Sequence, residues 1–271
     1  MIRNYKEFKK FITEYEDDGS IPKIIYRTSP FKFEEIPQVI LDSYKKDLEK
    51  SPEYSMFYFD DFDCQCFIEE NYGREYLSLY NRLIPTAFKA DLFRYLLLYK
   101  HGGVWMDFSM SLNTPLHRII SNFKQVYVRD RIYAIGNNWI SKVAIYQGFL
   151  CTIKGTEVLR VTIERCLKNI KDKNLTQSCL MVTGTIALGI VYRELGIDGI
   201  TDNKQPTKLG YINKDIYMYA YDYEHENVIL DNNTAIINIK HPDHYSLIYK
   251  NRDHYGELWN QQKVFLWVFA S

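Results

Sequence analysis

The sequence predicts an α/β fold, and its first 170 residues contain the observations behind this prediction. Two short apolar runs, at residues 21–26 and 54–59, have the length and composition of buried strands. Two longer segments, at residues 87–99 and 156–170, place apolar residues at helical spacing. Strands that alternate with helices along a chain form an α/β sheet with helices packed against it.

The 271 residues are expected to form a single domain. The length allows one large domain or two small ones, and the chain shows no internal repeat and no Pro-, Gly- or Ser-rich linker that would mark a boundary. Within residues 1–20, Phe8, Phe11, Ile12 and Tyr15 recur at helical spacing, which predicts an amphipathic helix packed on this domain. The same segment is charged throughout and lacks the apolar core of a signal peptide.

The remaining elements follow in chain order. Asp60 and Asp61, after the second strand, are good helix-capping residues. The helix at residues 87–99 is expected to stop at Gly102 and Gly103, since glycine adopts the left-handed conformation of a helix end. Residues 104–106 then begin another strand, and residues 125–135 alternate well enough for a strand or hairpin arm. The helix at residues 156–170 has an apolar face made of Val158, Leu159, Thr162, Ile163, Cys166 and Ile170.

Composition argues mildly against a general nucleic-acid-binding protein. The formal net charge is zero, whereas nucleic-acid binders usually carry a basic excess. The five cysteines are an odd number without zinc-site spacing, so reduced thiols and a cytoplasmic location are expected. No segment approaches the roughly 20 apolar residues that span a bilayer.

Residues 264–269 form an apolar run near the end of the sequence. Docking of this run into the domain's own core is predicted, because no basic cluster of the kind that supports interfacial binding flanks it. The alternatives are a dimer contact and attachment to a membrane surface that carries a lipid-linked acceptor. The oligomeric state is left open.

The helix at residues 87–99 carries two charged residues in an otherwise apolar stretch. Asp91 and Arg94 are three residues apart and therefore neighbours on one helix face. Burying charges costs several kcal/mol unless they are paired. The two residues form either an internal ion pair or a polar spot where the helix borders a ligand cleft.

Asp107 follows the strand that begins at residue 104. The strand's period of two places Asp107, Ser109 and Ser111 on one polar face. Open α/β sheets bind ligands at the ends of their strands, and a carboxylate there can ligate a hard divalent cation. The alternative is that Asp107 is an ordinary turn or capping aspartate.

These residues belong to a longer pattern that consists of Ala90-Asp91, Arg94-Tyr95, Leu98-Tyr99, Gly102-Gly103, Trp105 and Asp107. The pattern resembles the donor-site signature of DXD-type sugar transferases. It is similar to the α-1,6-mannosyltransferase-like group and closer still to capsular-polysaccharide-synthesis transferases. Weaker similarities, at residues 21–28, 113–116, 137–140 and 154–155, extend the resemblance over residues 21–170. The resemblance implies the GT-A fold, a nucleotide-binding α/β sandwich whose mostly parallel central sheet is flanked by helices.

The resemblance also implies a function, namely transfer of a sugar from a nucleoside-diphosphate sugar to a hydroxyl of a glycan or glycoconjugate acceptor in polysaccharide biosynthesis. Asp91 and Arg94 are expected to orient the sugar and the phosphates, and Asp107 to hold the ribose or a Mn²⁺ or Mg²⁺ ion. The remaining donor-binding positions are Tyr26 and Thr28, near the base or ribose, with Tyr95, Gly103 and Ser109.

One departure from the signature concerns the metal. The second aspartate of the motif is replaced by Ser109, a weak neutral ligand. His241 or His244, from the C-terminal third, is the candidate to complete the metal shell with Asp107. The alternatives are that other carboxylates complete the shell, that positive side chains replace the ion, and that these histidines lie in a surface loop. The alternatives to an active transferase are a non-catalytic nucleotide-sugar-binding module and a nucleotide-sugar hydrolase on the same fold.

Overall fold

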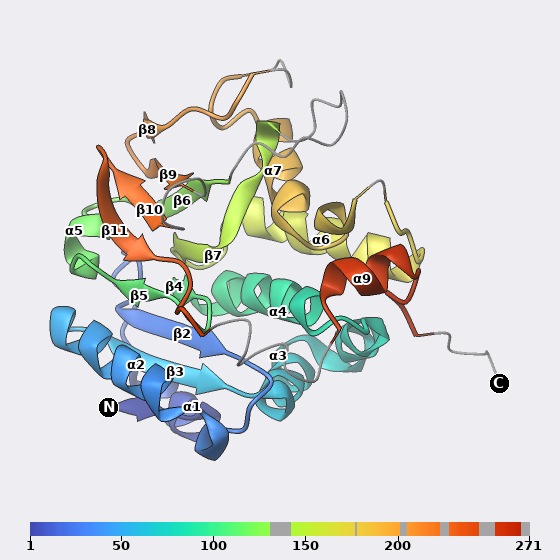
Figure 1. Ribbon diagram of the computed structural model, residues 1–271, viewed down its shortest axis with the longest axis horizontal. Helices are drawn as coiled ribbons and strands as arrows, with labels where there is room; N and C mark the ends of the chain where they lie inside the picture. The colour runs from blue at the N-terminus through green and yellow to red at the C-terminus, as the bar shows by residue number, and fades with distance from the viewer. Residues whose placement is uncertain (131–141, 177, 201–204, 223–227, 244–252, 267–271) are drawn as a thin grey trace.

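The computed structural model describes residues 1–130, 142–176, 178–200, 205–222, 228–243 and 253–266. Within these ranges eleven strands form one sheet, in the order β1-β3-β2-β4-β7-β6-β9-β10-β11-β5, with β8 paired to β9 (Figure 1). The strands are β1 (Ile2–Arg3), β2 (Ile24–Thr28), β3 (Ser55–Phe59), β4 (Gly103–Met106), β5 (Ser111–Leu112), β6 (Gln125–Arg129), β7 (Ile145–Thr152), β8 (Gly210–Asn213), β9 (Ile216–Asp222), β10 (Val228–Asp231) and β11 (Thr234–Asn238). The helices are α1 (Tyr5–Glu14), α2 (Gln38–Lys50), α3 (Asp61–Arg82), α4 (Thr86–His101), α5 (Leu116–Ile120), α6 (Glu157–Lys171), α7 (Thr185–Glu194) and α9 (Tyr255–Asn260), with short 3-10 turns η1 (Phe33–Glu35) and η3 (Cys179–Met181).

The predicted α/β fold is confirmed. Strands β1, β3, β2 and β4 are parallel and form the core of the sheet. Strand β7 joins this core to β6 through two antiparallel pairings, and β6 pairs parallel with β9. The strands beyond β9 continue antiparallel.

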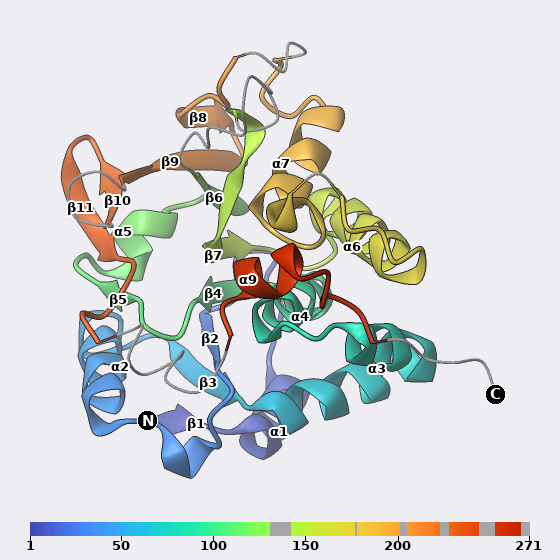
Figure 2. The ribbon, with the colours of Figure 1, turned by 45° about the vertical axis from the view of Figure 1, so that its right-hand side comes forward.

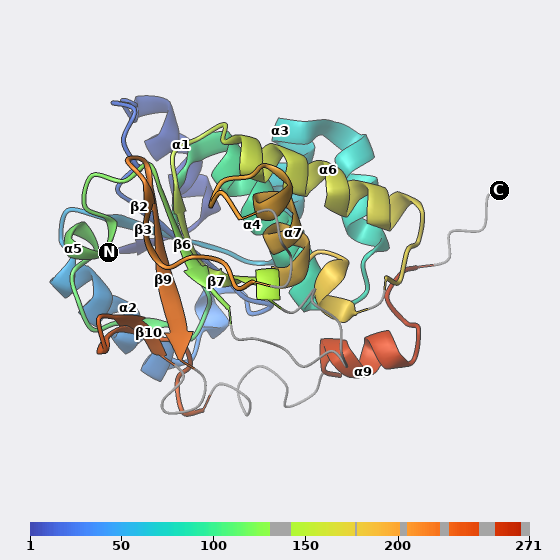
Figure 3. The same cartoon turned by 90° about the horizontal axis from the view of Figure 1, so that it is seen from above.

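Helices cover both faces of the sheet, which explains why its inner strands are mostly apolar. Alternate residues of β2 illustrate the two faces, because Ile24 and Tyr26 belong to one buried cluster and Ile25 to the other. The first cluster packs under α1, α3, α4, α6 and α7, and the second under α2 and α5 (Figure 3). None of the helices in the described ranges is long and apolar enough to cross a bilayer.

Most elements expected from the sequence are present. The N-terminal amphipathic helix is α1, which begins with a capping box between Asn4 and Glu7 and buries Tyr5 and Phe8. Strand β3 and the cap of α3 by Asp60 lie where predicted. Helix α6 buries all six residues of its predicted apolar face. The strand expected from residue 125 onward is β6, which ends at Arg129, and residues 131–141 lie outside the described ranges.

The end of β4 requires a correction. The strand stops at Met106, and residues 107–110 form a turn closed by a 3.0 Å hydrogen bond from the Met110 N–H to the Asp107 carbonyl. The alternating face predicted for Asp107, Ser109 and Ser111 therefore does not exist. The cause is Arg27, which is fully buried and donates to the carbonyls of Asp107 (2.7 Å) and Met110 (2.9 Å).

The C-terminal apolar run docks as predicted, as far as it is described. Val264 is fully buried and Phe265 is 6% exposed. Phe265 forms an antiparallel bridge with Leu83, in the connection between α3 and α4. Residues 267–271 lie outside the described ranges.

Candidate active site

Asp91, Arg94 and Asp107, predicted as the centre of the site, lie together. Helix α4 supplies Asp91 and Arg94, and the turn after β4 supplies Asp107. The Arg94 Nη2 atom lies 3.2 Å from Asp91 Oδ1, and Arg94 Nη1 lies 3.2 Å from Asp107 Oδ1. The side chains of Asp91 and Arg94 are 7% and 5% exposed, whereas that of Asp107 is 37% exposed. Asp107 is therefore the member of the cluster that a ligand can reach most easily.

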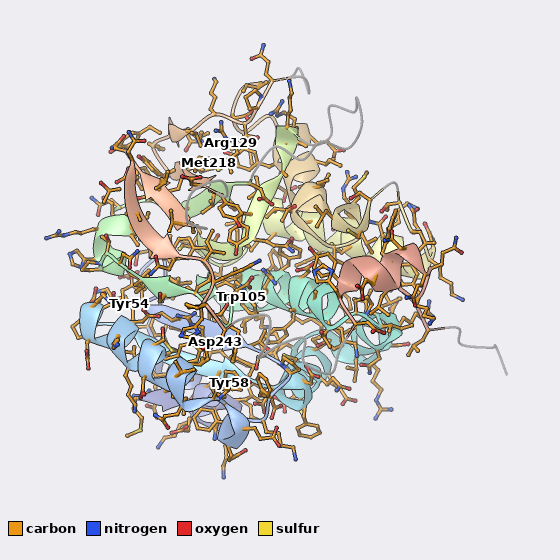
Figure 4. The ribbon with its side chains drawn as sticks, viewed as in Figure 1. Tyr54, Tyr58, Trp105, Arg129, Met218 and Asp243 are labelled. Carbon is orange, nitrogen blue, oxygen red and sulfur yellow. The ribbon has the colours of Figure 1, made fainter. Side chains whose placement is uncertain are left out.

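Arg94 is fixed by neutral groups as well as by the two carboxylates. Its Nη1 donates to the Gln147 carbonyl at 2.6 Å and its Nε to the Ala90 carbonyl at 3.2 Å. The guanidinium lies 5.0 Å from the ring centre of Trp105, a cation–π contact. Trp105, at the end of β4 beside α4 (Figure 4), donates from Nε1 to Asp107 Oδ1 at 2.9 Å. The orientation of both charged groups is thus set before any ligand binds.

A buried hydrogen-bond network holds Asp91. Gln147 donates to Asp91 Oδ1, and Thr183 Oγ1 donates to Asp91 Oδ2 at 2.9 Å. The Tyr95 hydroxyl contacts the Gln147 side-chain oxygen and lies 3.1 Å from the Thr183 carbonyl. Tyr95, predicted at the donor, is buried, so its contribution is to position Gln147 and Thr183. Sequence reasoning missed Gln147 altogether, because β7 offered no local signal for it.

The charges of the cluster follow from its burial. Burial raises the pKa of Asp91 from 3.8 to about 6, against the opposing effect of Arg94 and of the hydrogen bonds from Thr183 and Gln147. Burial alone would lower the pKa of Arg94, but Asp107 and Asp91 more than offset this, and the pKa lies above its ordinary value. At neutral pH the cluster therefore holds one cation between two carboxylates.

Two cavities meet at this cluster. The larger, of about 390 Å³, is lined by Asp91, Arg94 and Asp107 on one side and by Tyr146, Tyr221 and Tyr255 among others. The smaller, of about 140 Å³, extends from Arg94 and Asp107 to Thr28, Ser29, Asp61 and Lys89. The two share Ala87, Arg94 and Asp107, so the predicted site residues stand at their junction.

Of the other predicted donor-binding residues, Thr28 lines a cavity, whereas Tyr26, Gly103 and Ser109 are buried. Thr28 lines the smaller cavity and donates to the Phe59 carbonyl at 2.7 Å. Tyr26 needs a correction, because its ring is fully buried against Phe8 and lines neither cavity. Gly103 supports this packing, since a Cβ there would lie 2.7 Å from the Tyr26 ring. Ser109 is 5% exposed and lies within the turn that begins at Asp107.

The predicted metal set is not assembled by the described residues. His241 lines a different cavity, beside α2, with Lys46 and Asn238. His244 lies outside the described ranges. In the part of the chain that the structure describes, no group of three or more His, Cys, Asp or Glu side chains is placed to hold a metal ion. His241 is thus not among the residues that line the two cavities at Asp107.

Two further features shape the larger cavity. Helix α7 begins there, with Gly184 and Thr185 in the lining. Helix α9 lies against α4 (Figure 2), where the ring centres of Tyr255 and Phe88 are 6.0 Å apart. Close packing of α7 depends most on Gly189, where a Cβ would lie 1.6 Å from the Val143 carbonyl, and less on Gly184, where a Cβ would lie 3.0 Å from the Leu180 carbonyl.

Comparison with known proteins agrees with this geometry. Residues 37–126 match the family model described as "Glycosyltransferase sugar-binding region containing DXD motif". The chain is 31% identical over 102 residues to inositol phosphoceramide mannosyltransferase 3 of Schizosaccharomyces pombe, which covers 38% of this chain and 28% of the relative. It is 28% identical over 116 residues to the initiation-specific alpha-1,6-mannosyltransferase of Candida albicans. This match covers 41% of this chain and 30% of that relative. The chain thus spans about a third of the length of these relatives.

A solved structure shares the fold. The chain described as PaToxG glycosyltransferase superposes with a TM-score of 0.50 at 17% identity, over 72% of this chain and 78% of that one. The matched family segment contains Asp91, Arg94 and Asp107. The resemblance to DXD-type glycosyltransferases is therefore confirmed over residues 37–126, the segment that matches the family model.

Proposed function

We propose that this protein is a nucleotide-sugar-dependent glycosyltransferase that transfers mannose from a nucleoside-diphosphate donor to a hydroxyl of a glycan or glycoconjugate. One observation carries the proposal. The Asp91–Arg94–Asp107 cluster stands at the junction of two cavities, within the segment that matches a sugar-binding region. The choice of mannose rests on the names of the two mannosyltransferase relatives. The free state of all five cysteines supports a cytoplasmic location.

The two cavities suggest how the donor lies. The nucleoside occupies the smaller cavity, where Thr28, Asp61 and Lys89 offer polar groups. The diphosphate then lies at the junction, beside Arg94 and Asp107. The sugar extends into the larger cavity toward Asp91, where the buried carboxylate accepts hydrogen bonds from sugar hydroxyls.

Catalysis follows from the charge that develops on the departing diphosphate. Fixed hydrogen-bond donors and cations stabilise developing charge most strongly when they need not reorganise during the reaction. Arg94 is such a cation, because five groups hold it in place. Asp107 offers a carboxylate, the ligand type of hard divalent cations. Mg²⁺ is often held by one or two carboxylates together with substrate phosphates, so Asp107 fits a Mn²⁺ or Mg²⁺ ion that arrives with the donor. Such an ion supplies further positive charge to the diphosphate.

The test is a panel of GDP-mannose, UDP-glucose, UDP-galactose and UDP-N-acetylglucosamine, incubated with methyl α-mannopyranoside, with Mn²⁺ or with EDTA. We expect transfer from GDP-mannose that needs Mn²⁺ and is lost in Asp107→Ala. Saturable binding without turnover would identify a binding module, and release of mannose without transfer would identify a hydrolase. If no nucleotide sugar binds, the proposal is wrong.

A further inference from the structure

Tyr146 and Tyr221 form an aromatic wall of the larger cavity, whose Asp91 side is assigned to the donor sugar. Tyr146 lies on β7 and Tyr221 near the end of β9, with ring centres 5.0 Å apart and planes inclined by 46°. Both side chains are partly exposed, and both line the cavity. Strand β6 lies between their strands and pairs with each, which fixes their separation.

The tyrosine wall adjoins the reacting end of the site. A Cβ atom on Gly148 would lie 2.3 Å from the Tyr146 hydroxyl and 2.7 Å from Asp107 Oδ2. The Tyr146 hydroxyl and the Asp107 carboxylate oxygen therefore both lie close to the position that a side chain at residue 148 would occupy. Only glycine, which has no side chain, leaves this position free. A ring that rests on Tyr146 is consequently next to Asp107.

The chemistry of this wall selects a neutral polyol ring. Burial raises the pKa of Tyr146 well above its ordinary value, so the hydroxyl is neutral at physiological pH. The negative face of an aromatic ring attracts positively polarised edges, such as the C–H groups of a sugar ring. Asp130, which is 4% exposed, also belongs to the lining of this cavity. Aromatic surface with a few polar groups is the usual composition of a small-molecule site.

We infer that Tyr146 and Tyr221 form the acceptor subsite and that the acceptor group is a neutral six-membered polyol ring stacked on these tyrosines. The inference rests on the proposed function, since the donor must occupy the Asp91 side of the cavity. It goes further by naming the acceptor's chemical class and the wall that binds it. Either a terminal pyranose of a glycan or a cyclitol headgroup has this chemistry.

The experiment measures dissociation constants of GDP and of three probes, namely methyl α-mannopyranoside, myo-inositol and the acyclic polyol glycerol. Calorimetry is done on the wild type and on Tyr221→Leu, Tyr221→Phe and Tyr211→Leu. We expect at least one cyclic probe to bind more tightly than glycerol. Tyr221→Leu should weaken that probe about three- to tenfold, the value of one aromatic contact, and should affect GDP less. Tyr221→Phe, which keeps the ring, should bind like the wild type.

The control Tyr211→Leu removes a tyrosine that is 78% exposed and lies outside the cavity, so it should leave all constants unchanged. The cyclic probe that binds identifies the source of the ring. Unchanged probe affinity in Tyr221→Leu, or an equal loss of GDP and probe affinity, overturns the inference while leaving the proposed function intact. Failure of GDP and every nucleotide sugar to bind the wild type overturns the proposed function instead. Saturation transfer from tyrosine ring protons to the probe's C–H protons in the wild type tests stacking without any variant, and its absence also overturns the inference.

Discussion

Asp91 allows a quantitative test of the site, because its carboxylate is held away from water and yet beside Arg94. In the folded protein its pKa is about 6, raised by burial from 3.8. The shift corresponds to about 3 kcal/mol, at 1.36 kcal/mol for each pKa unit. Since the folded pKa lies above the unfolded one, this stability is fully present below about pH 4 and is lost as the pH rises through about 6.

The perturbation is Asp91→Asn, which keeps the shape of the side chain and removes its titration. The free energy of unfolding is measured by urea denaturation at pH 4, 5, 6 and 7.5 for both proteins. We expect the wild type, relative to the variant, to be roughly 2–3 kcal/mol more stable at pH 4 than at pH 7.5. If the amide of the variant changes a hydrogen bond, the free energy of unfolding changes by the same amount at every pH, and this amount cancels when the two pH values are compared. Asp63, whose pKa burial also raises to about 6, titrates in both proteins and cancels too.

Two outcomes would refute the reasoning. A difference between the proteins that does not depend on pH would mean that the Asp91 carboxylate is not desolvated. A difference of the opposite sign, with the wild type losing relative stability at low pH, would mean that the attraction of Arg94 exceeds the effect of burial.

The remaining predictions concern turnover and stability. Transfer should fall with a midpoint near pH 6 on the acid side if the ionised form of Asp91 binds the sugar, and the pH profile of kcat should lose this limb in Asp91→Asn. Asp107→Asn should lower kcat at least about 100-fold and move Tm little, since the side chain is 37% exposed; normal turnover in this folded variant would remove Asp107 from the site. Gly148→Ala should lower kcat with little loss of Tm, because the atoms it meets are the movable ends of two side chains, and an unaltered kcat would contradict the close approach. Deletion of residues 264–271 should lower Tm by several degrees, since it removes two buried side chains and the bridge to Leu83; an unchanged Tm together with loss of liposome binding would favour a membrane role.

The centre of the site was predictable because its signal is local. Asp91 and Arg94 are charges within one apolar helix, and the spacing of a helix alone places them side by side. Both interpretations offered for the pair hold, since it is an internal ion pair and also borders a cavity. Gln147 and Thr183, which bond to Asp91, are 56 and 92 residues away along the chain, so no local spacing connects them to Asp91.

The turn that carries Asp107 was not predictable for the same reason. Alternation of polar and apolar residues after Met106 favoured a longer strand. The competing force comes from Arg27, on another strand, which needs acceptors for its buried N–H groups and finds two of them in this turn. A metal shell shared by Asp107 and His241 stays a prediction, and the structure places His241 in the lining of the cavity beside α2.

The contacts that hold the turn at residues 107–110 have a consequence for ligand binding. Arg27 pairs with Asp47 at 2.6 Å, Asp47 accepts from the Leu112 N–H at 2.8 Å, and the Tyr44 hydroxyl donates to the Phe108 carbonyl at 2.8 Å. These contacts come from α2 and β2. The conformational entropy of residues 107–112 is therefore given up when the chain folds, not when the donor arrives. Binding free energy that would otherwise order this loop remains available to hold the donor.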